Sequence, residues 1–121
     1  MIGERVCALL SGGGYAEYAI ARLDLCLAVP DDLDLVHCAG LPEALFTITK
    51  NIFLIGQLRP DEHLLIHGGA SGIGTLGIQM AKSIGARVSV TAGTDEKCRL
   101  CRDLGADRAI NYKTEDFAAV L

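Results

Sequence analysis

The chain has 121 residues, a formal net charge of −4, and hydrophobic residues at half of its positions. This length is enough for one modest domain with an apolar core. The net negative charge, and the lack of a cluster of basic residues, argue against nucleic-acid binding. The sequence contains no charge-free run of about 18 apolar residues and no signal-peptide pattern at its start. We therefore expect a cytoplasmic protein that binds neither nucleic acid nor membrane.

The first third of the chain has the pattern of short β-strands. Residues 5–10 form an apolar run, the glycines at 12–14 predict a turn, and residues 15–21 alternate as a strand would. Residues 26–30 predict a further strand, which ends at its proline. This part of the chain is therefore expected to contribute to a β structure.

A helical pattern follows the acidic turn at 31–34. A short helix is expected over 35–40, and a longer one then presents one apolar face through residues at spacings of three and four: Leu45, Ile48, Ile52 and Ile55. The stretch "GQLRPDE" breaks this helix. We place the domain boundary here, with residues 1–58 before it and residues 59–121 after it.

From His63 onward, strand and helix patterns alternate. We predict strands over 63–67, 86–92 and 108–112, linked by helices over 73–84 and 94–104. Continuous apolar strands connected by helices indicate a parallel sheet, so this half is predicted to be a βαβαβ unit of the α/β class. Such a unit is half of a nucleotide-binding fold of the Rossmann type.

The loop "GGASGIG" joins the first of these strands to its helix and is rich in glycine. Gly72, Gly74 and Gly77 spell G-x-G-x-x-G, whereas Gly69, Gly72 and Gly74 give a second register. We favour the second register because the strand ends at His67, so the turn should follow at once. Glycines let the backbone turn tightly, and the helix N-terminus then offers N–H groups to a pyrophosphate. No G-K-[ST] follows, which excludes a P-loop.

The end of the second strand bears on the choice of nucleotide. NAD sites usually place an acid there, but Gly93 occupies the tip of "TAGTDEK". Asp95 and Glu96 fall in the first turn of the next helix behind Thr94, a candidate N-cap, and are interpreted as acids that favour the helix dipole. Lys97 supplies a cation for a 2′-phosphate. This pattern favours NADPH.

The cysteines number five and lie in apolar stretches: Cys7, Cys26, Cys38, Cys98 and Cys101. An odd count favours reduced thiols over a disulfide framework. Cys98 and Cys101 form a C-x-x-C, but both lie within a predicted helix and not at its start, which favours packed thiols over a redox or zinc pair. We predict no metal site.

Several stretches together resemble one family, in order and spacing: "GGGYAEYAIA", "VPDDLDLVHCAGLPEALFT", "LLIHGGASGIGTLGIQMAKSIGARV", "TAGTDEKC" and "LGADRAINYKTEDF". The family is the zinc-free quinone oxidoreductases of the medium-chain dehydrogenase/reductase superfamily, in particular the ζ-crystallin-like group. The resemblance implies a two-domain enzyme in which a GroES-like domain flanks a Rossmann domain. It also implies NADPH as cofactor, a quinone as substrate and a homodimer. The chain would then be a piece of that enzyme, a partial Rossmann sheet preceded by the end of the GroES-like domain.

The resemblance also assigns site residues. The threonine near the nicotinamide corresponds to Thr47, the contacts to the 2′-phosphate correspond to Lys97 and Tyr112, and Gly93 lies close to the ribose. The nucleotide loop corresponds to Gly69, Ala70, Ser71, Gly72, Ile73 and Gly74. Glu43 stands near the place of a catalytic cysteine in the zinc alcohol dehydrogenases, so no catalytic zinc is expected. We name no catalytic acid or base, because hydride transfer is the chemistry of the cofactor.

Two alternatives remain. The glycine loop also resembles that of short-chain dehydrogenases, but about 60 residues precede it here and no Tyr-x-x-x-Lys is present. A non-catalytic NADPH-binding module is the other alternative.

Overall fold

A computed structural model describes residues 2–121. The chain divides into two compact units, Met1–Phe46 and Thr47–Leu121, which are considered separately below. This division falls within a helix, whereas the predicted domain boundary follows residue 58, where the βαβαβ pattern begins. That boundary stays a prediction. Within the described residues, no helix is long and apolar enough to cross a membrane.

The first unit is built on two short antiparallel strands, β1 (Val6–Ala8) and β2 (Cys26–Ala28). A 3₁₀ turn at Leu23–Leu25 leads into β2, and the short helix α1 (Leu35–Cys38) follows it. The Arg5 guanidinium donates hydrogen bonds to the carbonyl oxygens of residues 30 and 31, at 3.2 and 3.1 Å. A charged side chain therefore links β1 to the turn that follows β2.

The predicted strand over residues 15–21 is wrong. The segment has no regular structure, and its apolar side chains Tyr15, Tyr18 and Ile20 are almost fully exposed. Alternating residues form a strand only where a neighbour pairs the backbone and a second layer covers the apolar face. Among the described residues, β1 and β2 pair with each other and leave this segment without a partner.

The predicted long helix is present but changes its winding. Helix α2 (Leu41–Ile48) runs directly into a π-helical segment, Thr49–Ile55. The Gly56 amide donates to the Asn51 carbonyl at 2.9 Å, which closes the wider turn, and the Asn51 side chain donates to the Thr47 carbonyl at 2.8 Å. The apolar spacing predicted a helix but could not distinguish these two windings, because their hydrogen bonds differ in span by only one residue.

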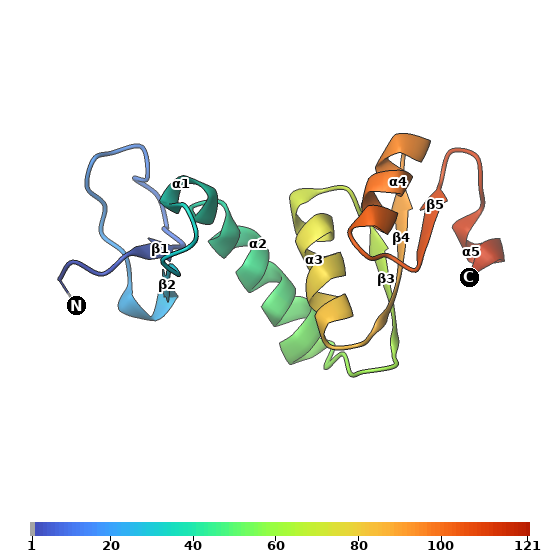
Figure 1. Ribbon diagram of the computed structural model, residues 1–121, viewed down its shortest axis with the longest axis horizontal. Coiled ribbons are helices and arrows are strands. Elements are labelled where there is room, and N and C mark those ends of the chain that lie inside the picture. Colours follow the sequence, from blue (N-terminus) through green and yellow to red (C-terminus); the bar gives the residue numbers. More distant parts are fainter. Residues whose placement is uncertain (1) are drawn as a thin grey trace. The chain divides into compact units, whose positions relative to one another are not determined.

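The second unit contains a three-stranded parallel sheet in the order β3–β4–β5 (Figure 1). Its strands are β3 (His63–His67), β4 (Arg87–Ala92) and β5 (Arg108–Asn111), connected by helices α3 (Gly72–Ser83) and α4 (Asp95–Asp103). The α/β fold with a βαβαβ order is thus confirmed. Parallel pairing brings the carboxyl ends of all three strands to one edge, where nucleotide sites of such folds lie.

An apolar layer joins the sheet to α3 and α4. Its members are fully or nearly fully buried: Ile78, Ala81, Ala86, Val88, Val90, Cys101 and Ala106. Cys98 is also buried, and burial raises the pKa of the Cys98 and Cys101 thiols. All five cysteines are free, as the sequence predicts. The packing of the second unit therefore fixes the strand ends on which the site is built.

The opposite face of the sheet carries polar side chains. The His63 and His67 rings lie within hydrogen-bonding distance of the Ser89 and Thr91 hydroxyls, at 2.7 and 3.1 Å. Helix α5 (Phe117–Val120) follows β5, and its Phe117 ring meets the His67 ring edge-on at a centroid distance of 5.0 Å. These contacts order the strand ends on the face opposite α3 and α4.

Candidate functional site

The glycine loop begins directly after β3, as the favoured register requires. Gly68 adopts a φ of 71°, and the chain turns over residues 68–70 before α3 begins at Gly72. Ser71 is the N-cap of α3, and its hydroxyl accepts a hydrogen bond from the Gly74 amide at 3.0 Å. Because the first N–H groups of a helix lack intrahelical acceptors, the loop directs backbone donors toward whatever lies above α3.

The loop is anchored to β4 through Thr91. The Gly69 amide donates to the Thr91 carbonyl at 2.9 Å, and the Gly68 amide approaches the Thr91 hydroxyl at 3.4 Å. Thr91 is 3% exposed, so this anchor is shielded from water. The turn is thereby held at the centre of the sheet edge.

The glycines of the loop serve two different purposes. A Cβ atom added to Gly69 would lie 2.6 Å from the Val90 Cβ atom, and one added to Gly74 would lie 2.5 Å from the Gly68 carbonyl oxygen. At these two positions, packing of the protein itself requires glycine. A Cβ atom on Gly72 would meet nothing within 4 Å, so the space above this residue is open.

The opposite wall comes from the ends of β4 and β5. A Cβ atom on Gly93 would lie 2.8 Å from the Tyr112 hydroxyl oxygen, so the phenol rests directly against the backbone after β4. Lys97 reaches the same place from the first turn of α4, where the Thr94 hydroxyl caps the helix by accepting from the Lys97 amide at 3.2 Å. Glycine at 93 thus makes room for the tyrosine.

These walls enclose a cavity of about 210 Å³. It is lined by Gly68, Ala70, Ser71, Ala92, Gly93, Lys97 and Tyr112. Five predicted site residues therefore line one cavity, although they come from separate stretches of the chain. In the part of the chain described here, no carboxylate lies within ion-pairing distance of the Lys97 ammonium, whereas the Lys82 ammonium binds Asp107 at 2.9 Å.

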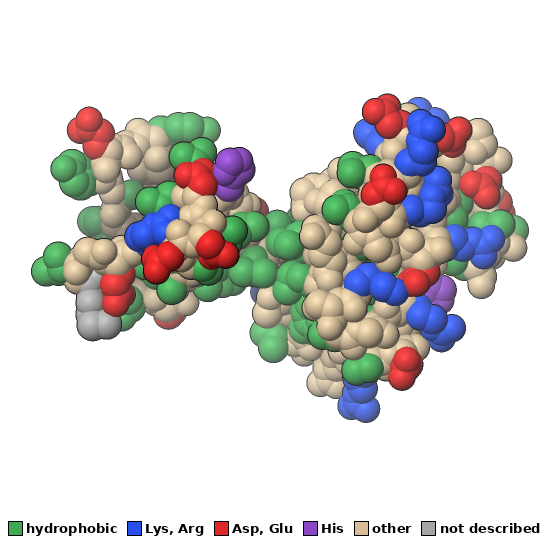
Figure 2. Space-filling model, in the orientation of Figure 1, with side chains coloured by type: hydrophobic (Ala, Val, Ile, Leu, Met, Phe, Trp, Pro, Cys, Tyr) green, Lys and Arg blue, Asp and Glu red, His purple; other side chains and the backbone are tan. Residues whose placement is uncertain are grey.

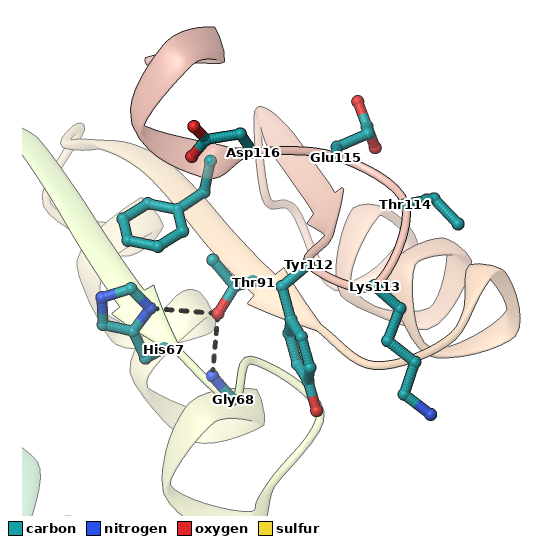
Figure 3. A pocket seen from close by; sticks show the side chains of 9 residues that line it. His67, Gly68, Thr91, Tyr112, Lys113, Thr114, Glu115 and Asp116 are labelled. Carbon is teal, nitrogen blue, oxygen red and sulfur yellow. Dashed lines mark hydrogen bonds between the residues drawn. The ribbon is translucent and has the colours of Figure 1, made fainter.

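A larger hollow of about 990 Å³ adjoins this cavity at the same edge (Figure 3). Its lining includes His67, Thr91 and Phe117, together with the turn after β5. Tyr112 lines both spaces, and Figure 3 shows its ring beside Gly68 and Thr91. Together the two hollows follow the carboxyl edge of the sheet.

The chain is similar to known oxidoreductases. Residues 72–121 match the family model described as Zinc-binding dehydrogenase. The 2-haloacrylate reductase of a Burkholderia species is 37% identical over 123 residues, which cover 99% of this chain and 37% of that protein. The quinone oxidoreductase of Mus musculus is 34% identical over 116 residues, which cover 95% of this chain and 35% of the relative.

Solved structures agree with these matches. The quinone oxidoreductase of Thermus thermophilus, whose structure is known also in complex with NADPH, is 32% identical, with a TM-score of 0.83. The similarity covers 93% of this chain and 38% of that one. The chain belongs to the medium-chain dehydrogenase/reductase superfamily.

Membership in the medium-chain superfamily confirms the resemblance and makes the short-chain dehydrogenase interpretation wrong. The chain spans a little over a third of the length of these two relatives. Within residues 2–121, no three His, Cys, Asp or Glu side chains are grouped so that they could hold a metal ion.

Not every predicted residue faces the cavity. Thr47 lies half-buried in α2 and is not among the residues that line either hollow at the sheet edge. Gly69 and Gly74 lie buried within the loop, and Ile73 is 45% exposed. The roles of these residues stay predictions.

Sequence reasoning missed Gly68 and Ala92, which line the smaller cavity, and also Asn111, which directly precedes the lining residue Tyr112. Asn111, the last residue of β5, is 8% exposed, and its amide nitrogen donates to the Asp95 carboxylate at 2.7 Å. The only available signal was a polar residue at the end of an apolar strand. Its partner could not be inferred, because that requires knowing how β5 lies against α4.

Proposed function

We propose that this chain forms the NADPH-binding part of an oxidoreductase that reduces quinones. The observation that carries the proposal is the cavity between the glycine loop and the ends of β4 and β5. Ser71, the N-cap of α3, lines it on one side, and Lys97 lines it on the other. A dinucleotide carries phosphate groups that match both features.

The residues of the cavity have separable tasks. Backbone N–H groups at the start of α3 would bind the pyrophosphate, and the open space above Gly72 lets that group approach closely. Lys97 would bind the 2′-phosphate, and the Tyr112 phenol, held against Gly93, would bound the ribose. NADPH would supply the hydride, while the chain supplies position and charge. Thr47 is proposed to lie near the nicotinamide, as the family resemblance implies.

A quinone substrate is supported by the similarity to the quinone oxidoreductases of mouse and Thermus thermophilus. A second candidate is supported by the similarity to the 2-haloacrylate reductase, which covers 99% of this chain. That substrate would be an activated carbon–carbon double bond. A non-catalytic NADPH-binding module would bind the nucleotide and oxidise it with neither acceptor.

The test titrates the purified chain with NADPH and NADH and follows nucleotide fluorescence. NADPH should bind more tightly than NADH, and Lys97→Met should weaken NADPH binding about 10- to 100-fold, since hydrogen bonds to charged groups are worth about 1.5–3 kcal/mol. NADH binding should change little. Arg99→Ala provides the control, because Arg99 is exposed on the same helix and does not line the cavity.

Acceptor choice is then tested by loss of NADPH absorbance with 1,2-naphthoquinone or 2-chloroacrylate. Turnover with the quinone supports the proposal, and turnover with the haloacrylate alone supports the second candidate. Binding without turnover supports the non-catalytic module. If the chain binds neither nucleotide, the proposed cofactor site is wrong.

A further inference from the structure

The Asn111 side chain uses both ends of its amide. Its nitrogen donates to the Asp95 carboxylate at 2.7 Å, and its oxygen accepts from the Lys113 backbone amide at 3.2 Å. Asn111 is only 8% exposed to solvent, whereas Asp95 is exposed, so a nearly buried amide holds a carboxylate that lies at the surface. The side chain therefore ties the start of α4 to the turn after β5.

The backbone of Asn111 orders the same turn. Its carbonyl accepts from the amides of Thr114 and Glu115, at 3.0 and 2.9 Å, and its amide donates to the Glu115 carboxylate at 3.3 Å. The turn that carries Tyr112 and Lys113 is thus fixed by one residue at its base. Figure 3 shows the Tyr112 and Lys113 side chains projecting from this turn.

The contact with Asp95 matters because of where that acid stands. Asp95 is the first residue of α4, two positions before Lys97 and two positions after Gly93. An acid near the end of the second strand is the group that binds the ribose 2′-hydroxyl in NAD sites. Here its carboxylate is bound to Asn111, and Asp95 is not among the residues lining the 210 Å³ cavity.

The charge that the cavity presents to a nucleotide depends on the direction in which the Asp95 carboxylate points. With its carboxylate held by Asn111, the Lys97 ammonium is the charged group that lines the cavity. A carboxylate released toward the cavity would repel a 2′-phosphate, offset the charge of Lys97 and accept a hydrogen bond from a 2′-hydroxyl. Other charged residues near Asp95 and Asn111 are Glu96, exposed on α4, Glu115, which is bound to the Asn111 amide, and Lys113, which lines the larger hollow.

We propose that Asn111 is a positioning residue that sets nucleotide specificity. By holding the Asp95 carboxylate out of the cavity, it makes the site accept a 2′-phosphate and disfavour a free 2′-hydroxyl. This inference rests on the proposed function, since it concerns how that same site chooses between NADPH and NADH.

The test is a double-mutant cycle on the 121-residue chain with Asn111→Ala, Asp95→Asn and the double variant. Dissociation constants for NADPH and NADH are measured by titration, and folding is checked by circular dichroism. Asn111→Ala should lower the preference for NADPH over NADH about tenfold, because a released charge acts at short range. Asp95→Asn should keep the preference, and the double variant should regain it, because no charge is left to release.

A merely structural role predicts a different outcome. Asn111→Ala would then weaken both nucleotides equally, and adding Asp95→Asn would restore nothing; either result overturns the inference. If Asn111→Ala fails to fold, Asp95→Glu at the exposed partner position replaces it. Its longer carboxylate should overshoot the Asn111 amide and lower the NADPH preference, and an unchanged preference overturns the inference.

The wild-type chain separates this failure from that of the proposed function. Binding of NADPH with strong preference, unchanged in every folded variant, rejects the role of Asn111 alone. A wild-type chain that binds neither nucleotide rejects the cofactor site and the inference with it.

Discussion

The two units of this chain are held by different forces. The second unit places Ile78, Val88 and Val90 at 0% exposure between its sheet and helices, so hydrophobic burial dominates its stability. In the first unit, few apolar side chains are buried, and Tyr15 and Tyr18 are fully or almost fully exposed. There, hydrogen bonds from Arg5 connect the segments. A dense layer beneath the strand ends is what a cavity of fixed shape requires.

The largest expected difference between the two units is in the reactivity of their cysteine thiols. Cys101 is fully buried and its pKa is raised by burial, whereas Cys26 in the first unit is partly exposed. We expect iodoacetamide to modify Cys26 at least about 1,000-fold faster than Cys101, because reaction at a core thiol requires unfolding that costs several kcal/mol. Mass spectrometry of timed digests measures both rates. Comparable rates would mean that the core of the second unit opens readily.

Removal of core volume should destabilise the second unit strongly. Ile78→Ala leaves a cavity in the layer between α3 and the sheet and should cost about 3–4 kcal/mol of unfolding free energy. Tyr18→Ala in the first unit, where the residue is 90% exposed, should change it by less than about 0.5 kcal/mol. Urea titration followed by circular dichroism compares them. Equal losses would contradict the division drawn between the units.

The glycine loop allows a finer test within the second unit. Gly74→Ala places a methyl group 2.5 Å from the Gly68 carbonyl oxygen and should cost about 2–3 kcal/mol, as overpacking does. Gly72→Ala, two residues away and facing open space, should change stability by less than about 1 kcal/mol. The same urea titration separates the pair. A costly Gly72→Ala would show that an unseen contact constrains this position.

The smallest expected effect is a loss of stability at low pH. The Lys82 ammonium, followed by the Val88 amide, lowers the pKa of the Asp107 carboxyl group. Because its folded-state pKa lies below the unfolded one, Asp107 stabilises the fold above the unfolded pKa, and this contribution disappears as the pH falls through the folded-state value. Since the side chain is 46% exposed, the contribution should stay below about 1 kcal/mol.

Asp107→Asn should therefore lower the urea midpoint at pH 7, and its effect should shrink as the pH falls through the folded-state pKa of Asp107. Asp24 serves as the matched residue in the first unit, since its pKa is also lowered, by exposed Arg22 two residues away. Asp24→Asn should leave the midpoint unchanged over the same pH range. An equal effect of the two substitutions would show that the ion pair between Lys82 of α3 and Asp107 before β5 adds nothing to stability.

Much of the second unit could be predicted because its signals are local. Strand and helix periods and the glycine loop all depend on neighbouring residues, and Gly105, just after α4, adopts a φ of 109°, which favours glycine. The first unit could not be predicted equally well. Residues 15–21 have strand-like alternation, but whether a strand forms depends on a partner that alternation does not identify.

The site follows the same rule. Lys97 and Gly93 could be proposed because they follow the second predicted strand, and the parallel strands of a sheet end at a common edge. That Asp95 is bound to Asn111 and does not line the cavity could not be inferred, because the two residues lie 16 positions apart and meet only through the packing of α4 beside β5. Asp95 was interpreted as a helix-dipole acid, and the structure adds a specific partner.

On the surface, the second unit mixes charges of both signs over the face seen in Figure 2. The Lys82–Asp107 pair shows how a lysine on this unit is neutralised by a carboxylate 25 residues away. Lys97 has no such partner among the described residues. Lys113 is in none of these ion pairs either, so the position of Lys97 in the wall of the 210 Å³ cavity is what makes its charge available for a ligand.

Gly69 packs closely against core side chains and so connects the glycine loop to the interior. An added Cβ atom would lie 2.6 Å from the Val90 Cβ atom and 3.0 Å from the Cys101 sulfur. The volumes at positions 69, 90 and 101 are therefore shared, and a larger residue at one requires a smaller one at another. Natural variation at these three positions should be correlated, and a redesign of the loop for another nucleotide has to begin in the core beneath it.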